Sequence, residues 1–142
     1  MDKEKITQTI IGEMEGIKKA LLDLAKEKSE SEGPKTSWHN TIHLDIERNI
    51  EWNQGRLFTF NKVLSTLEKS EYTGLIIDGS IIFLEIGEDK GIYIVVEKGA
   101  GTIGEYVILS LQSPIGQLIS GQPVGYQAVS PAGDTIKVLQ VI

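Results

Sequence analysis

The sequence contains no cysteine among its 142 residues. This absence excludes disulfide bonds, cysteine-ligated zinc and thiol nucleophiles, and it is typical of proteins that stay in the cytoplasm. The chain also lacks an apolar run of about 18 residues, the length that a membrane-spanning helix needs. Its first residues, MDKEKITQTI, are too charged for a secretory signal. We therefore expect a cytoplasmic protein with no membrane partner.

Positive charge is also scarce. The chain has 14 lysines and arginines against 20 acidic residues, a net charge of −6, and it contains no basic run. This balance argues against tight, general binding to a phosphate backbone. Apolar residues make up 40% of the chain, which is enough to form a core. The composition therefore predicts a folded protein of about one or two small domains.

Charged residues are concentrated in the first half of the chain. Residues 1–72 contain 11 basic and 13 acidic side chains, whereas residues 73–142 contain 3 and 7. Glycine, valine and isoleucine become frequent where the charge density falls. We therefore place a domain boundary here, with a helical domain over 1–72 and a β domain over 73–142.

Apolar residues in the first half recur in alternating steps of three and four, the spacing of a coiled-coil seam. The two predicted seams consist of Ile6, Ile10, Met14, Ile17, Leu21 and Leu24, and of Ile46, Ile50, Asn53, Leu57, Phe60, Leu64 and Leu67. The segment SESEGPKTS between them contains Gly33 and Pro34, which interrupt a helix. The pattern predicts an antiparallel helical hairpin in which the buried Asn53 amide fixes the register, and Trp52 lies off the seam.

Short β-branched runs with glycine-rich turns fill the second half. The predicted strands are LIID, SIIFLEI, GIYIVVEK, YVILSL, VGYQAVS and TIKVLQVI. Between the fourth and fifth runs, Ser113 can cap a short helix, Pro114 suits its first turn and Gly121 can end it. The sequence therefore predicts an α+β fold, in which a helical hairpin precedes an antiparallel β domain with one short helix lying across its sheet.

The last thirty residues, SPIGQLISGQPVGYQAVSPAGDTIKVLQVI, resemble the end of bacterial Gre-type transcription elongation factors. The matching positions, in order, are Ser113, Pro114, Ile115, Leu118, Ile119, Gly121, Pro131, Gly133 and the closing IKVLQVI. The resemblance implies an N-terminal helical hairpin and an FKBP-like β domain. In that family the β domain docks on RNA polymerase, so Ser113, Pro114 and Ile115 are implied to form part of the contact.

A second implied contact lies in the segment EKGAGTIGEY, residues 97–106. In the Gre-type family the corresponding loop is acidic and lies beside the polymerase. Here Gly99, Ala100 and Gly101 replace those acids. Either the contact is more apolar in this protein, or a different polymerase surface is used.

The resemblance also implies that the hairpin enters the secondary channel of RNA polymerase, near the 3′ end of the transcript. In the family, two carboxylates at the hairpin tip help to hold a second Mg²⁺, and the polymerase then hydrolyses a backtracked transcript. Aligning Trp38 and His39 with the family's Tyr-His pair places the two acid positions at Ser31 and Pro34. Neither side chain is a carboxylate, so no catalytic residue is carried over.

Other tip residues leave alternatives open. Glu30 and Glu32 are either substitute carboxylates or part of a solvated turn, and Lys35 also lies at the tip. Trp38 is either a wedge against the polymerase or a packing residue. His39 and His43 have the spacing of a metal-binding pair, but their position on the extended seam favours packing between the helices.

The resemblance, with no acids at the two aligned tip positions, implies a monomeric regulator that binds RNA polymerase and is not itself an enzyme. It needs no cofactor or metal of its own, and the Mg²⁺ of the polymerase becomes relevant only if the tip is active. The alternative is a factor that stimulates transcript cleavage through Glu30 and Glu32. A prolyl isomerase is a third alternative that rests on fold alone, since the β-domain aromatics, Tyr72, Tyr93, Tyr106, Tyr126 and Phe83, indicate no aromatic-lined pocket.

Overall fold

The computed structural model describes residues 2–30 and 37–142, except that the side chains of residue 30 and residues 37–43 lie outside the description. Two long helices, α1 (Lys3–Glu30) and α2 (Ser37–Lys69), precede six strands and a short helix, α3 (Pro114–Ile119). This order confirms the predicted α+β class. The chain divides into two compact units, one formed by Met1–Ile10 with Lys62–Ile142 and the other by Ile11–Asn61. The predicted boundary between residues 72 and 73 falls between α2 and the first strand, and it stays a prediction.

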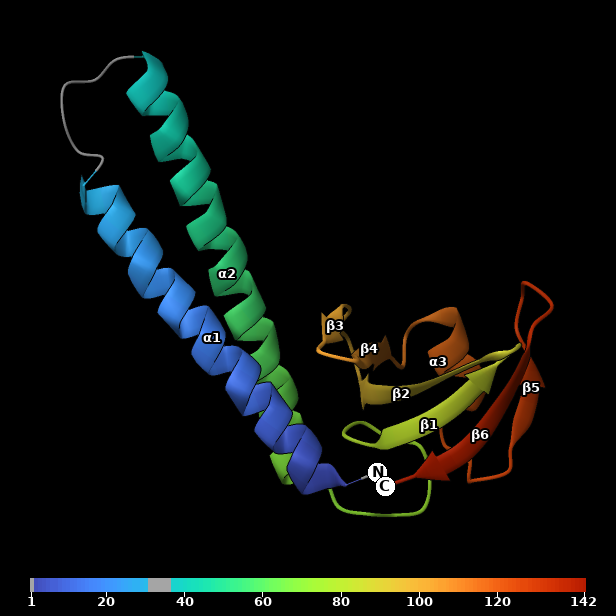
Figure 1. The fold of residues 1–142 in the computed structure, drawn as a ribbon. Coiled ribbons are helices and arrows are strands. Elements are labelled where there is room, and N and C mark those ends of the chain that lie inside the picture. The colour runs from blue at the N-terminus through green and yellow to red at the C-terminus, as the bar shows by residue number, and fades with distance from the viewer. Residues whose placement is uncertain (1, 31–36) are drawn as a thin grey trace. The chain divides into compact units, whose positions relative to one another are not determined.

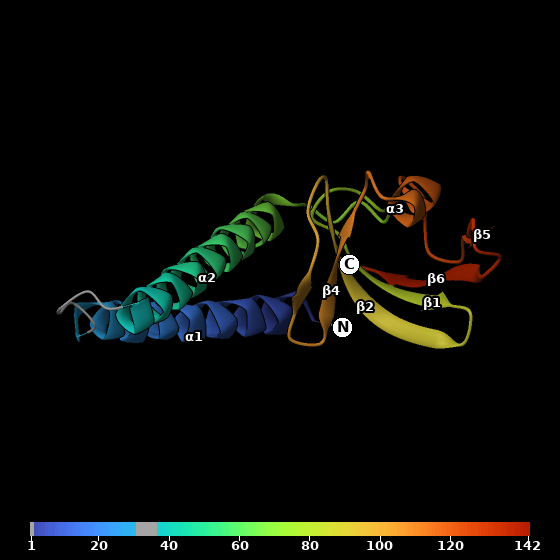
Figure 2. The ribbon, with the colours of Figure 1, turned by 90° about the horizontal axis from the view of Figure 1, so that it is seen from above.

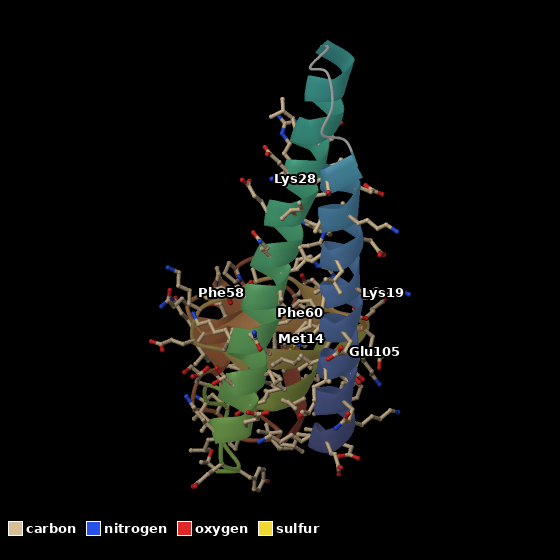
Figure 3. The ribbon with its side chains drawn as sticks, turned by 90° about the vertical axis from the view of Figure 1, so that its left-hand side faces the viewer. Met14, Lys19, Lys28, Phe58, Phe60 and Glu105 are labelled. Carbon is tan, nitrogen blue, oxygen red and sulfur yellow. The ribbon has the colours of Figure 1, made fainter. Side chains whose placement is uncertain are left out.

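The unit formed by residues 11–61 consists of the paired lengths of α1 and α2 (Figure 1). Met14 and Phe60 are 5% and 4% exposed, and both point toward the space between the helices (Figure 3). Phe58 points away from that space and is 73% exposed. An ion pair between Lys28 of α1 and Glu47 of α2, with 3.4 Å between Nζ and Oε1, also joins the helices. The alternating three-and-four spacing therefore identified the buried face correctly.

The other unit contains a six-stranded sheet in the order β3-β4-β2-β1-β6-β5 (Figure 1). The strands are β1 (Ile81–Ile86), β2 (Asp89–Val96), β3 (Thr102–Ile103), β4 (Tyr106–Ser110), β5 (Gln127–Val129) and β6 (Thr135–Val141). Four of the five neighbouring pairs are antiparallel, as predicted, but β2 and β4 run parallel. Their parallel course arises because the chain returns through residues 97–105, which include the short antiparallel strand β3, before β4 begins. The carboxyl ends of β2 and β4 consequently lie side by side.

Helix α3 covers one face of this sheet, as the sequence predicted (Figure 2). Ile119 on α3 is fully buried with Leu84 of β1, Val95 of β2 and Val138 of β6 in one apolar cluster. Alternate strand residues supply this cluster because successive side chains point to opposite faces of a sheet. The core therefore fixes the face on which α3 lies.

The predicted strand LIID, residues 75–78, does not form. Leu75 makes only an isolated antiparallel bridge to Pro123, and the Ile77 amide donates to Oγ of Ser80 at 3.0 Å. The chain turns at Gly79, whose φ of +89° favours glycine. Because the Ile77 amide is bonded to Ser80 within this turn, residues 75–78 do not form the extended run that a further strand would need.

Candidate docking surface

The Ser-Pro pair begins α3 in the manner that the sequence predicted. Oγ of Ser113 accepts a hydrogen bond from the Gly116 amide at 3.0 Å, and Pro114 occupies the first helical turn. The Ser113 hydroxyl also donates to the carbonyl oxygen of Ser110 at 2.6 Å. The Ser113 hydroxyl thus both donates and accepts a hydrogen bond within the protein. Its main role in this structure is to cap α3.

Close packing against the end of β4 holds α3 in place. A Cβ on Gly116 would overlap the carbonyl oxygen of Ser110, so this position accepts only glycine without movement of the helix. Ile115 is half-buried and packs against the core cluster. Pro114 and Gln117 are exposed. Of the three predicted contact residues on α3, Pro114 is therefore the one best placed to touch a partner.

The loop after β2 supplies the other predicted contact residues. Ala100 and Gly101 are exposed, whereas Gly99 is half-buried, and a Cβ there would lie 3.2 Å from Cγ2 of Val96. The Gly101 carbonyl accepts from the Ile108 amide at 2.8 Å. Gly101 also has a φ of +116°, which favours glycine. Backbone conformation at Gly101 and close packing at Gly99 thus explain two of the glycines in this loop.

Parallel pairing of β2 and β4 brings these two segments together. Val96, the last residue of β2, lies opposite Ser110, the last residue of β4. The Leu111 amide donates to the Val96 carbonyl at 2.8 Å, and the Ser110 hydroxyl donates to the Glu97 carbonyl at 3.0 Å. Residues 97–101 and 112–117 therefore form one continuous region, which we call the docking surface.

The docking surface carries little net charge. Its exposed members are Glu97, Lys98, Ala100, Gly101, Gln112, Pro114 and Gln117. The Glu97 and Lys98 side chains have opposite charges, and the other groups are amides, a proline ring and small residues. Within the part of the chain that the structure describes, no cluster of three or more His, Cys, Asp or Glu side chains is placed to hold a metal ion.

Sequence reasoning missed Ser110, which adjoins the docking surface, and two residues of the surface itself. Ser110 forms the link between the two segments, and Gln112 and Gln117 are exposed beside Pro114. The Gln117 side-chain amide donates to the Gln112 carbonyl at 3.2 Å. The sequence signal for these residues is the polar pair Gln112-Ser113 before Pro114. Polar residues that closely follow a buried strand often form turns and helix caps.

The predicted tip residues cannot be placed. Ser31, Glu32, Pro34 and Lys35 lie outside the described residues. The backbones of Glu30, Trp38, His39 and His43 are helical, but their side chains lie outside the description. Their predicted roles stay predictions.

Asn53 and Trp52, the other polar and aromatic features of the hairpin, are described. Asn53 is 7% exposed, and its side-chain amide donates to the Asn49 carbonyl of the same helix at 2.8 Å. This bond does not cross to α1, so it gives no support to a role in register. Trp52 is 62% exposed, in agreement with its position off the seam.

The aromatic residues of the sheet unit differ in exposure. Tyr106 is buried, and Tyr93 is half-buried beside the core cluster, whereas Tyr72 is 73% exposed. A hollow of about 310 Å³ near Leu75 and Val141 has the Tyr72 ring in its lining. One exposed ring gives this hollow little resemblance to an aromatic-lined catalytic pocket.

None of the described helices is sufficiently long and apolar to cross a lipid bilayer.

No protein-family model matches the chain, and no curated protein sequence matches it. The chain is similar to a solved structure of the transcription factor Gfh1, with 18% identity over 95% of this chain and 92% of the other and a TM-score of 0.40. It is also similar to GreA factor homolog 1 (Gfh1) of Thermus thermophilus, with 18% identity, coverage of 96% and 94%, and a TM-score of 0.39. For Gfh1 of Thermus aquaticus the identity is 20%, the coverage 94% and 92%, and the TM-score 0.40.

Proposed function

We propose that this protein is a transcription regulator that binds RNA polymerase and inserts its helical hairpin into the polymerase secondary channel. One observation carries the proposal. The resemblance to Gre-type factors assigns polymerase contact to Gly99, Ala100 and Gly101 and to residues 113–115. In the fold the segments that carry these residues lie side by side, and the hydrogen bond from Ser110 to Glu97 links the strand end before 113–115 to the start of the loop. Two segments that are separate in the sequence thus form one surface, as a shared partner requires.

The proposed regulator lacks the two catalytic carboxylates of the family. Mg²⁺ binds oxygen ligands, and a second catalytic ion needs charge-bearing oxygens to neutralise it. Ser31 and Pro34, which align with the family's acids, cannot supply them. The protein therefore acts by occupying the channel near the transcript 3′ end, as a monomer with no metal or cofactor of its own.

Co-elution with core RNA polymerase tests the binding. The purified chain should elute with the polymerase during size-exclusion chromatography at low salt. The variant Pro114→Asp places a charge at the centre of the docking surface and should elute later, as free protein. Pro131→Asp is the matched control, because Pro131 is an exposed proline that also follows a serine but lies in the β5–β6 turn. Separate elution of the unmodified chain would refute the proposal.

The alternative function is stimulation of transcript cleavage by Glu30 and Glu32. It is favoured by the presence of two carboxylates within four residues of the aligned acid positions. Adding the protein to a backtracked elongation complex distinguishes the two functions. We expect no shortened transcript. Shortened products that disappear in the double variant Glu30→Ala/Glu32→Ala would establish the alternative.

A further inference from the structure

We propose that Ser110 is the positioning residue of the docking surface and that its hydroxyl holds the loop over 97–101 beside α3. This inference rests on the proposed function, because it concerns the same surface. Ser110 is the last residue of β4 and is half-buried. It lies between the two predicted contact segments without belonging to either.

The Ser110 hydroxyl joins two backbone segments. It donates to the Glu97 carbonyl at 3.0 Å and accepts from the Gln112 amide at 3.1 Å. A serine hydroxyl has one hydrogen and two lone pairs, so both bonds can exist at once. This group thus connects the first residue of the loop to the segment that leads into α3.

The Ser110 carbonyl makes a separate set of contacts with α3. It accepts from the Ser113 amide at 3.1 Å and from the Ser113 hydroxyl at 2.6 Å. The backbone of Gly116 packs against the same oxygen. The carbonyl therefore fixes the start of α3, whereas the hydroxyl fixes the loop. A substitution that removes only the hydroxyl should release the loop and leave the helix in place.

Glu97 is held from both sides of its backbone. Its carbonyl accepts from Ser110, and its amide donates to Oδ1 of Asp78 at 2.9 Å. Beyond it, Ala100 and Gly101 are exposed, and the Gly101 carbonyl accepts from the Ile108 amide. Without the Ser110 hydroxyl, the loop would lose the bond that ties it toward Pro114. The two halves of the docking surface would then be joined through the backbone pairing of β2 with β4 and the bond from the Leu111 amide to the Val96 carbonyl, without the side-chain bond at Glu97.

The variant Ser110→Ala tests this role through polymerase affinity. Losing the two hydroxyl bonds should weaken binding about tenfold, because a less ordered loop must be ordered when the complex forms. Ser110→Thr keeps a hydroxyl and suits a strand, so it should restore most of the affinity. The matched control is Ser130→Ala, which removes a hydroxyl that accepts from the Asp134 amide at 3.1 Å in the β5–β6 turn. It should leave polymerase affinity unchanged.

Hydrogen exchange in the free protein gives a readout that does not depend on the polymerase. In Ser110→Ala the Gln112 amide should exchange faster, while the Gly116 amide, bonded to Ser113, should keep its protection. Unchanged Gln112 exchange would overturn the positioning role even if the polymerase does not bind. Equal polymerase affinity of Ser110→Ala and the unmodified chain would overturn it as well. Absence of binding by the unmodified chain, with faster Gln112 exchange in the variant, would refute the proposed function while supporting the positioning role.

Discussion

The guanidinium carbon of Arg56 lies 4.7 Å from the centre of the Trp52 ring, one helical turn away on α2. The same carbon lies 5.5 Å from the centre of the buried Phe60 ring. Arg56 therefore lies close to both an exposed and a buried aromatic ring. The Arg56 side chain therefore covers part of the exposed Trp52 ring.

The contact should be measurable by a double-mutant cycle with Trp52→Ala and Arg56→Ala. We expect a coupling energy of about 0.5–1 kcal/mol, the range of cation–π contacts at exposed sites. Urea unfolding of the four proteins provides the measurement. A coupling energy indistinguishable from zero would mean that the contact has no effect on stability.

Gly116→Ala should destabilise the protein by about 1–3 kcal/mol, because the added Cβ meets the Ser110 carbonyl and α3 must shift. The control is Gly12→Ala on α1, where a Cβ finds no atom within 4 Å. That variant should be more stable by about 0.5–1 kcal/mol, since alanine favours a helix more than glycine does. Urea unfolding measures both. Equal stability of the two variants would contradict the close packing.

Asn53→Leu should raise the stability of the hairpin by roughly 1 kcal/mol. The buried amide bonds within its own helix, and a polar residue at a seam position lowers coiled-coil stability. The melting temperature, followed by helical circular dichroism, is the measurement. A lower melting temperature would indicate that the Asn53 carbonyl oxygen has an important partner on α1.

Burial, and secondarily the charge of Asp89, raises the pKa of the Tyr93 hydroxyl above its ordinary value of 10.0. The unfolded chain therefore loses this proton first as the pH rises. The stability that this group contributes is complete below about pH 10 and is lost as the pH rises through the pKa of the folded protein. Tyr93→Phe should show a smaller fall in unfolding free energy above pH 10. An identical fall in both proteins would exclude this contribution.

The proposed binding to RNA polymerase should depend only weakly on salt, because the docking surface combines one positive and one negative side chain with neutral groups. A tenfold increase in salt should change the dissociation constant by less than about threefold. Lys98→Glu would create an acidic surface and should make the salt dependence larger. A steep dependence in the unmodified chain would indicate that a more charged surface forms the contact.

The sequence alone determined the helices and their buried faces. The spacing of residues such as Met14 and Phe60 specifies a seam, because a helix brings every third or fourth residue to one face. The capped start of α3 was also predictable from Ser113 and Pro114. Capping depends on neighbouring residues, so its signal is local in the sequence.

Only the tertiary structure decided how the candidate site is assembled. The antiparallel sheet was predicted, but the parallel pairing of β2 with β4 was not, because strand order depends on contacts between distant segments. That pairing places Val96 opposite Ser110 and so brings the loop over 97–101 to α3. The role of Ser110 follows from this juxtaposition. A serine carries the same hydrogen-bonding groups wherever it occurs, and the fold alone determines which segments those groups connect.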